Sequence, residues 1–357
     1  MKLVILNDTH AGVRNSSEIF IEYQRRFYQD VLFPYMDKHN IKKIVHGGDY
    51  YDHRKYVNFK ALNANRKNFI EPMVERGITM DIIPGNHDVA YKNTNDLCSL
   101  KELLGYYKKH INIVMSPTVM DYDGFKLALL PWINPENYDE SMQFIQTCNA
   151  EWLLGHLEVI GVEMMRGVTN THGIDPSLFS RFEKVLSGHF HTRSVLGNIE
   201  YLGSQMEFTW SDYNDPKFFH VIDTETRELT PVRNPITIFE KVVYNDAEID
   251  YNSNDYKLPE LNDKYVKIVV AKKTDPYLFD KFVSRIQNEF NLHDLKIVES
   301  FDEFLGSNVD LSDNVKIEDT SELLDNYIEQ VETELDKERL KTAMRMIYVE
   351  ALNMEIS

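Results

Sequence analysis

Short apolar segments that end in polar turns recur along the first half of the chain. "KLVIL" runs into "NDTH", "KKIV" into "HGGDYYD", and "TMDII" into "PGNHD". Apolar runs of this length, bounded by glycine and polar residues, are typical of buried strands. Helical-length segments near residues 17–40 and 59–76 separate the three runs. This alternation predicts a partly parallel sheet with helices packed on it.

Two further apolar segments end in the same way. "EWLL" leads into "GHLE", and "KVL" leads into "SGHFHT". Ligands of parallel α/β sheets gather at the carboxyl ends of the strands. We therefore expect the five polar turns to meet at one edge of the sheet structure.

The pattern changes from about residue 195. "IEYLGS", "FFHVIDTET" and "ELTPVRN" predict consecutive antiparallel strands, and residues 238–300 predict a small β–β–α–β unit. A polar, acidic stretch then reads as a linker, and the tail from Ser321 has apolar residues at helical spacing. The expected domains are residues 1–236, a small α+β domain at 237–304, an acidic linker at 305–320 and a helical segment at 321–357.

The apolar residues of the tail form two narrow stripes separated near Asp336. The first comprises Leu324, Ile328, Val331 and Leu335, and the second comprises Leu340, Met344, Ile347 and Ala351. The stripes fit either a helix pair that packs on its own domain or helices that dock on the coiled coil of a partner. The long acidic linker and the narrow stripes favour docking.

The acidic residues are concentrated in the last third of the chain. The 357 residues include 39 Lys/Arg and 57 Asp/Glu, for a net charge of −18. Residues 246–357 hold 13 Lys/Arg and 26 Asp/Glu, which leaves a net charge of −5 for residues 1–245. An acidic protein is a poor general binder of polyanions. If the ligand is a nucleic acid, bound cations or a partner protein must offset the repulsion.

The remaining composition indicates a globular cytoplasmic protein. Its 43% apolar content is ordinary for a folded chain. Cys98 and Cys148 are the two cysteines, too few for a disulfide framework or a cysteine-rich zinc site, and they favour a reducing cytoplasm. The apolar run at the N-terminus is too short for a signal peptide, and no apolar run approaches the length of a membrane span.

The five polar turns share aspartate and histidine residues, together with one asparagine. In chain order these residues are Asp8, His10, Asp49, Asp52, Asn86, His87, Asp88, His156, His189 and His191. A single histidine at the end of a strand is most often a hydrogen-bonded structural residue, but that interpretation does not explain the whole ordered series. Carboxylates, imidazoles and an amide carbonyl suit Mn²⁺, Fe²⁺ or Zn²⁺, and the absence of thiolates argues against structural zinc.

The series therefore predicts a dinuclear metal site. Two cations ~3.5–4 Å apart need a bridging anion, which an aspartate can supply. Such a pair polarises phosphoryl oxygens and lowers the pKa of a bound water, so that hydroxide is available near neutral pH. A histidine that binds no metal can stabilise or protonate the leaving oxygen.

The five motifs, in this order, resemble those of the calcineurin-like metallophosphoesterase superfamily. Over essentially its full length the chain is more narrowly similar to the nuclease subunit of the SbcCD-type double-strand-break repair complex, in its phage recombination branch. "GDYYD", "PGNHD", "GHLE" and "SGHFHT" carry the resemblance. It implies a four-layer α/β/β/α sandwich with a small α+β capping domain that binds DNA and with C-terminal helices.

The resemblance also implies a role for each site residue. The first metal would be ligated by Asp8, His10 and His191, and the second by Asn86, His156 and His189, with Asp49 bridging. His87 matches the histidine that contacts the phosphate and assists the leaving group, and Asp88 matches the residue that orients it. Two Mn²⁺ ions are the implied cofactors, with Mg²⁺ or other divalent cations possible.

The implied activity is the hydrolysis of DNA in recombination, repair and replication. Relatives of this kind degrade duplex ends as exonucleases, generally 3′ to 5′, and cut single strands as endonucleases. The implied partners are DNA and an SbcC-type coiled-coil ABC ATPase, in a heterotetramer that contains a homodimer of the nuclease. Helices near residues 59–76 and 96–109 are candidates for the dimer contact. The expected location is the cytoplasm, that of the host if the chain comes from a phage.

Two stretches depart from the family pattern. "GSQ" at residues 203–205 stands where "GSP" is expected, which we interpret as a change in a loop rather than in metal ligation. "DHR" at residues 52–54 differs from cellular relatives in a region that lies near the DNA. Asp52 fits either a partner for a ligand histidine or a carboxylate that faces solvent.

Two other functions compete with the nuclease. A protein phosphatase or small phosphodiesterase would use the same scaffold, but phosphatases have Arg after "GDxxD" and "GNHE" as the third motif, whereas this chain has His53 and Asp88. Neither function would need a capping domain and a helical tail. A scaffold that holds the ATPase without catalysis would not need the complete set of ligands.

Overall fold

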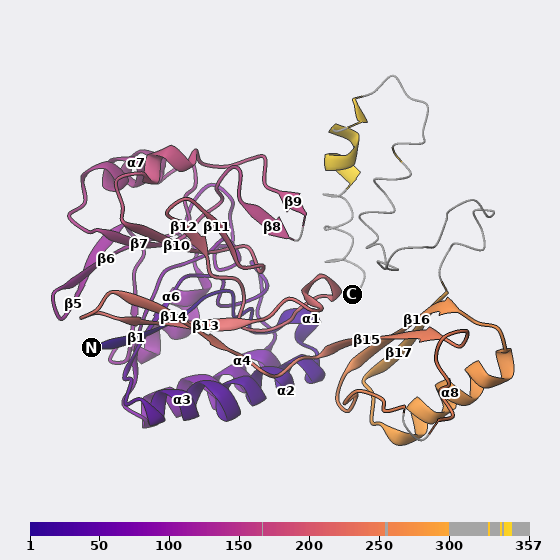
Figure 1. Cartoon of the computed structure of the whole chain (residues 1–357). Helices are drawn as coiled ribbons and strands as arrows, with labels where there is room; N and C mark the ends of the chain where they lie inside the picture. Colours follow the sequence, from indigo (N-terminus) through magenta and orange to yellow (C-terminus); the bar gives the residue numbers. More distant parts are fainter. Residues whose placement is uncertain (166, 254–255, 300–327, 329–335, 338, 345–357) are drawn as a thin grey trace. The chain divides into compact units, whose positions relative to one another are not determined.

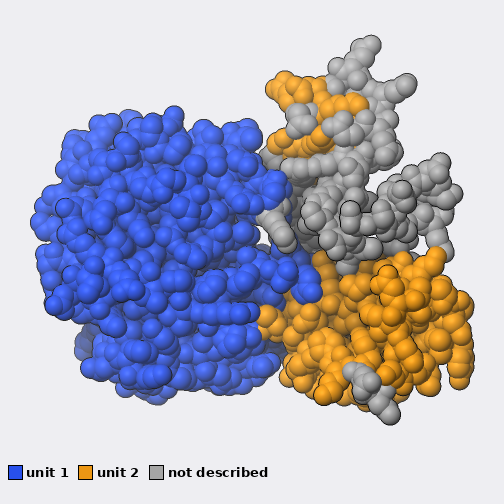
Figure 2. Space-filling model, in the orientation of Figure 1, with its two compact units in different colours: residues 1–236 blue, residues 237–357 orange. Residues whose placement is uncertain are grey.

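The computed structural model describes residues 1–165, 167–253, 256–299, 328, 336–337 and 339–344. The chain divides into two compact units, Met1–Ile236 and Thr237–Ser357, which Figure 2 shows in different colours. The domain bounds expected from the sequence stay a prediction.

A mixed six-stranded sheet begins at the N-terminus of the first unit. Its strand order is β14-β13-β1-β2-β3-β4. The bounds are β1 Lys2–Leu6, β2 Lys43–His46, β3 Thr79–Ile82, β4 Ile111–Ile113, β13 Phe218–Asp223 and β14 Glu228–Arg233. Strands β1 to β4 pair in parallel, while β13 and β14 add an antiparallel edge. The first three polar turns therefore follow neighbouring parallel strands, as the alternation of apolar and helical segments predicts.

Helices α2 Glu18–Arg26, α3 Phe33–Lys38 and α4 Phe59–Asn65 cover the outer face of this first sheet (Figure 1), and they belong to a longer series of helical segments between the strands. The series also contains α1 Val13–Ser16, η1 Phe27–Leu32, η2 Arg66–Ile70, α5 Glu71–Glu75, α6 Ser99–Leu104 and η3 Gly105–Tyr107. Aromatic rings make the contact: Phe27 of η1 and Tyr35 of α3 both pack on Phe219 of β13. Each fully buried Phe contributes about 1.5–3 kcal/mol to folding, so these contacts fix the helices on the strands.

A second mixed sheet faces the first, with strand order β11-β12-β10-β7-β6-β5. Its bounds are β5 Thr118–Tyr122, β6 Phe125–Leu130, β7 Trp152–His156, β10 Lys184–Gly188, β11 Ser194–Leu196 and β12 Ile199–Tyr201. Strands β6, β7 and β10 pair in parallel. The last two polar turns follow β7 and β10. A small hairpin of β8 Glu163–Met165 and β9 Val168–Thr169 lies between them in the chain.

Alternate residues of the second sheet serve two separate apolar cores. Leu154 of β7 and Leu186 of β10 point toward Ile5 of the first sheet and form the core between the sheets. Leu153 and Val185 point the other way, where the core includes residues from α7 Tyr138–Thr147 and η4 Pro176–Phe179. This two-residue period separates the layers. The result is the expected α/β fold, with two mixed sheets flanked by helices.

The second unit contains a three-stranded parallel sheet and one helix. The strand order is β15 Phe239–Asn245, β16 Tyr265–Lys272 and β17 Asp294–Glu299. Helix α8, Pro276–Glu289, connects β16 to β17, and Asp275 caps its N-terminus by accepting hydrogen bonds from two backbone N–H groups. Tyr244, Phe279 and Phe282 pack together in its core. This is the β–β–α–β unit predicted from the sequence.

One expectation for the strands after residue 195 is wrong. Strand β12 is not the neighbour of β13, because it lies in the second sheet between β10 and β11, whereas β13 belongs to the first. The alternation of apolar residues identifies a strand but carries no information about which of two facing sheets receives it. Strand β13 does pair with β14 in antiparallel fashion, as expected.

The C-terminal expectations fall mostly outside the described residues. The acidic linker at 305–320 is not described, and neither is most of the helical segment. Ile328 and residues 339–344 are helical, and the amide of Leu340 donates a hydrogen bond to the carbonyl of Asp336. In the part of the chain that the structure describes, no helix has both the length and the hydrophobicity to cross a membrane.

A buried histidine between the sheets makes the stability of the first unit sensitive to acid. His220 of β13 faces the inner core, and neither of its ring nitrogens has a hydrogen-bond partner among the described residues. Burial, aided by the charges of Arg193 and Lys184, lowers the pKa of His220 to about 3. In the unfolded chain this imidazole has a pKa near 6.5. Its contribution is complete above pH 6.5 and is lost as pH falls toward 3, because the unfolded state then binds the proton.

We therefore expect His220→Leu to flatten the acid limb of the stability curve. Between pH 7 and pH 5 the free energy of unfolding of the variant should fall by about 2 kcal/mol less than that of the wild type. Urea unfolding in EDTA, followed by the fluorescence of the tryptophans, measures this difference. The exposed His39 provides the control position for the same substitution, His39→Leu. An unaltered acid limb in His220→Leu would contradict the assignment.

Candidate metal centre

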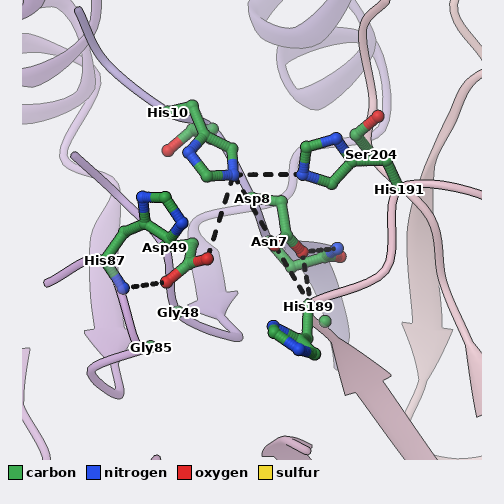
Figure 3. Close-up of polar contacts among 12 residues, drawn as sticks. Asn7, Asp8, His10, Gly48, Asp49, Gly85, His87, His189, His191 and Ser204 are labelled. Atoms are coloured by element: carbon green, nitrogen blue, oxygen red, sulfur yellow. Dashed lines mark hydrogen bonds and ion pairs between the residues drawn. The ribbon is translucent and has the colours of Figure 1, made fainter. Parts of the chain in front are cut away.

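Asp8, His10 and His191 converge from two facing strands. Asp8 and His10 follow β1, and His191 follows β10, yet one ligand atom of each lies within 4.8 Å of the others. The Nε2 atoms of His10 and His191 are 3.1 Å apart, and His10 Nε2 lies 3.9 Å from Asp8 Oδ1 (Figure 3). Asp8 and His10 are buried, while His191 is half-buried. This group, called here the first cluster, offers two imidazoles and one carboxylate to a cation.

A second cluster lies beside it at the ends of β2, β7 and β10. It contains Asp49, His156 and His189, whose candidate ligand atoms also lie within 4.8 Å of one another. The Oδ1 atom of Asn86 joins them, 3.0 Å from His156 Nε2 and 2.9 Å from His189 Nδ1. The other ring nitrogen of His156, Nδ1, lies 2.9 Å from the carbonyl oxygen of Gly47. A proton on Nδ1 would therefore leave Nε2 free to coordinate.

Asp49 lies between the two clusters. Its Oδ2 atom is 3.9 Å from His10 Nε2 and 3.3 Å from His156 Nε2. The amide of His87 donates a hydrogen bond of 2.7 Å to the other oxygen, Oδ1, and so fixes the carboxylate (Figure 3). This is the position that an anion bridging two cations needs.

The turn "SGHFHT" divides its two histidines between the clusters. His189 has its Nδ1 against Asn86, whereas His191 has its Nε2 against His10. Phe190, between them, is buried and stacks on Tyr201, with ring centroids 4.9 Å apart. The two imidazoles therefore diverge around an apolar anchor instead of clamping one ligand together.

Four residues of the clusters have a left-handed backbone. The φ angles are 48° for Asp8, 44° for His10, 53° for Asp49 and 91° for His189. Residues other than glycine adopt this conformation at a cost of about 1–3 kcal/mol, and such strain is concentrated at functional sites. Backbone hydrogen bonds between the turns hold it in place: the amide of Asp8 donates to Gly48 O and that of His10 to Asp49 O.

His87 and His10 are both held by Asp52. The Nδ1 atom of His87 is within hydrogen-bond distance of the main-chain carbonyl of Asp52, and His10 Nδ1 lies 3.2 Å from Asp52 Oδ1. The two imidazole rings meet edge to face, with centroids 5.0 Å apart. Of the two roles that the sequence left open for Asp52, the structure therefore shows contact with a cluster histidine.

Asp88 does not contact the ring of His87 among the described interactions. Its carboxylate is fully buried and accepts hydrogen bonds from the amides of Tyr50, Tyr51 and Gly85, at 2.9–3.2 Å. It thereby joins the turn after β2 to the turn after β3. Burial, followed by the nearby charge of Asp49, raises the pKa of Asp88 to about 7, although the amides act in the opposite direction.

Each cluster contains one histidine that attracts a proton and one that rejects it. Burial opposes protonation of His10 and His156, but contacts with Asp52 and Asp49, respectively, and the surrounding carboxylates raise both pKa values to about 9. Burial, aided by the neighbouring charged histidine, lowers the pKa of His189 to about 3 and that of His191 to about 4. The carboxylates thus favour positive charge in each cluster, and a bound cation would compete with a proton there.

Several residues that support the site carry no motif. Lys217 is buried and its Nζ atom donates hydrogen bonds to Asp212 Oδ1 at 2.6 Å, Asp215 Oδ2 at 2.8 Å and the carbonyl of His191 at 2.9 Å. Gln205, in the divergent "GSQ" stretch, is buried and donates from Nε2 to the carbonyl of Asp8. Only Gln205 gave a sequence signal, through its departure from the family pattern. The departure at Gln205 therefore affects a hydrogen bond to the cluster residue Asp8, and not only a loop.

Comparison with known proteins agrees with this geometry. The family model of the calcineurin-like phosphoesterases matches residues 1–193, more than half of the chain. The chain belongs to this family. It is 30% identical over 356 residues to exonuclease subunit 1 of enterobacteria phage T4, which covers 98% of this chain and 99% of that protein.

Two bacterial proteins are more distant relatives of this calcineurin-like phosphoesterase. The SbcD component of the SbcCD nuclease of Staphylococcus saprophyticus is 23% identical over 289 residues, covering 71% of this chain and 76% of that protein. The protein of the same name from Staphylococcus epidermidis is 23% identical over 256 residues, covering 64% and 67%. The match to the phage protein covers 98% of this chain. It therefore extends beyond residues 1–193, which the family model matches, and includes the second unit.

We expect the buried ion pair of Lys217 with Asp212, beside the main chain of His191, to contribute strongly to stability. Lys217→Met should lower the free energy of unfolding by about 3–5 kcal/mol, because it leaves the Asp212 carboxylate buried without its cation. Urea unfolding followed by tryptophan fluorescence reports on the first unit, which contains all three tryptophans. The exposed Lys126 provides the matched control, and Lys126→Met should change stability by less than about 0.5 kcal/mol. Equal effects of the two substitutions would refute the role of Lys217.

Proposed function

We propose that this protein is a metal-dependent DNA nuclease, the SbcD-like subunit of a phage recombination and repair complex. The observation that carries the proposal is the position of Asp49 between two histidine–carboxylate clusters, with Oδ2 3.9 Å and 3.3 Å from one histidine nitrogen of each. The near full-length relationship to a phage exonuclease subunit supports DNA as the substrate.

The proposed ligands follow the two clusters. Asp8, His10 and His191 would bind the first metal, and Asn86, His156 and His189 the second, with Asp49 shared. The donors fit a divalent cation of intermediate softness, because they are nitrogen and oxygen atoms without a thiolate. Two Mn²⁺ ions are the proposed cofactors, and Mg²⁺ is the competing choice.

When bound, such a metal pair polarises the phosphodiester and makes hydroxide available near neutral pH. The protein contributes the position and protonation of His87. If Nδ1–H of His87 donates a hydrogen bond to the carbonyl of Asp52, Nε2 lies on the other side of the ring, and in the imidazolium form it carries the second proton. His87 is half-buried, so this edge can reach the leaving oxygen and protonate it. Asp88 acts indirectly, by fixing the turns that carry Asp49 and His87.

The scaffold also fits a protein phosphatase or small phosphodiesterase. All three share the two-metal chemistry, so the site alone does not separate them. The nuclease is favoured because the phage relative matches 98% of the chain, including the second unit, for which we propose a capping role at the DNA. His53, in place of the arginine of phosphatases, points the same way.

The proposed partners are an SbcC-type coiled-coil ATPase and a second copy of this chain. The bacterial relatives are named as components of an SbcCD nuclease, which implies a complex. Phe59 at the start of α4 is 86% exposed and Tyr106 of η3 is 93% exposed. Both lie in the segments expected to form the dimer contact, where large exposed aromatic side chains suit a protein interface. The proposed location is the cytoplasm, that of the host cell for a phage protein.

A direct assay separates the nuclease from the phosphatase. With Mn²⁺, the protein should release nucleotides from 3′-labelled duplex DNA and leave a phosphopeptide intact. The same reaction with Mg²⁺, with EDTA, and with or without the ATPase partner tests the metal and the complex. Turnover of the phosphopeptide with intact DNA would sink the nuclease proposal.

Replacing His87 should separate chemistry from metal binding. His87→Asn removes the proton donor but none of the proposed ligands, so we expect cleavage to fall by 10²-fold or more. Titration calorimetry should still give two Mn²⁺ per chain. His189→Ala should instead weaken one of the two binding events, because His189 belongs to the second cluster alone. Unchanged cleavage by His87→Asn would refute its role as acid.

A further inference from the structure

A hollow of about 310 Å³ opens beside the second cluster. His156 lines the hollow and also belongs to the cluster, so the two are adjacent. The lining of the hollow comes from two groups of residues besides His156: residues of 132–138, among them Trp132 and Tyr138, and residues that include Glu158 and Ile174. The volume is at the lower end of the roughly 300–1,000 Å³ typical of ligand pockets, which fits one nucleoside better than a longer segment of chain.

Trp132 forms a preset platform in this hollow. Its amide donates a hydrogen bond to Pro84 O at 2.9 Å, and its carbonyl accepts hydrogen bonds from the side chains of Asn95 and Asn137, each at 3.0 Å. Its ring lies 5.9 Å from that of His156 and 5.4 Å from that of His189, between centroids. The indole is therefore fixed next to two proposed metal ligands before any ligand enters, which lowers the entropic cost of binding.

The part of the lining at Glu158 and Ile174 depends on a glycine. The amide of Ile174 donates a hydrogen bond to the carbonyl of Glu158 at 2.8 Å. Gly173 has a φ of 107°, and a Cβ atom on it would lie 2.2 Å from that same carbonyl oxygen. The chain can pass this close to Glu158 only because residue 173 has no side chain. Glu158 is the sole carboxylate residue among the described residues that line the hollow.

We propose that this hollow binds the nucleobase of the nucleotide whose phosphate lies at the metal centre, an inference that rests on the proposed nuclease function. The base stacks on Trp132, since an aromatic platform beside a phosphate site is a general means of holding single-stranded nucleotides. Glu158 accepts a hydrogen bond from an exocyclic amine. Adenine, cytosine and guanine carry such an amine, whereas thymine has none, and its one imide N–H lies between two carbonyl oxygens that a carboxylate repels.

A thermodynamic cycle between the protein and the DNA tests the platform. DNA ends that differ only at the nucleotide to be released, cytosine or an abasic analogue, are cleaved by the wild type and by Trp132→Ala. In the wild type, loss of the base should lower kcat/KM about tenfold or more, and in Trp132→Ala it should change kcat/KM less than twofold. Trp132→Phe retains a ring and should restore part of the base effect, which guards against a folding defect.

A charge-matched pair of variants tests base selection. The wild type should prefer cytosine to thymine at the released position, and Glu158→Gln, whose amide both donates and accepts, should lose this preference. Glu136 lies in the same loop as Trp132 but does not line the hollow, so Glu136→Gln should keep it. Independently of cleavage, calorimetry should show tighter binding of dCMP than dTMP to the wild type, and equal binding to Glu158→Gln.

The outcomes distinguish this inference from the proposed function. Wild-type protein that cleaves no DNA in Mn²⁺ overturns the nuclease assignment, and the subsite with it. Cleavage with the same abasic penalty in the wild type and in Trp132→Ala overturns the subsite alone. Cleavage with a cytosine preference that survives in Glu158→Gln removes Glu158 from base selection and overturns that part of the inference.

Discussion

The burial of three carboxylates at one edge of the sheets is the constraint on which this structure depends. Asp8, Asp49 and Asp88 are almost inaccessible to water, and a buried carboxylate is costly unless it is paired and hydrogen-bonded. Each receives its own amides or imidazoles: Asp8 accepts from the side chain of Asn7 and the amide of His189. The turns after five strands are arranged to supply these donors. The two proposed metal positions are the remaining positive charges that the arrangement needs.

The same constraint explains why the turns approach one another so closely. A Cβ atom on Gly85 would lie 2.2 Å from Asp49 Oδ1, and one on Gly48 would lie 2.7 Å from His156 Nδ1. The glycines of "HGGD" and "PGNHD" therefore leave room for the cluster residues rather than merely allowing the chain to turn. The left-handed backbone of Asp8, His10 and Asp49 has the same origin, because side chains that converge from facing sheets cannot all keep the conformation of a strand.

The sequence could predict this edge because its signal is local. An apolar run followed by a polar turn identifies the end of a buried strand, and parallel strands bring such ends together. Pairings across the sheets are not local: nothing near His191 indicates that its Nε2 meets that of His10, and only the family resemblance suggested it. The prediction for β12 was wrong for the same reason, because the sheet that a strand joins is not set by nearby residues. Lys217 was missed because a lysine between apolar strands has the appearance of an ordinary surface residue until its two aspartate partners are placed.

Asp52 shows how a protein with a net charge of −18 can hold a polyanion at this edge. The local field, not the total charge, acts on a phosphate within a few ångströms. Asp52 contacts Nδ1 of His10 with its carboxylate and Nδ1 of His87 with its main-chain carbonyl, so each histidine has Nε2 for its other contacts. Cations held by the two clusters would supply positive charge to a phosphate bound there.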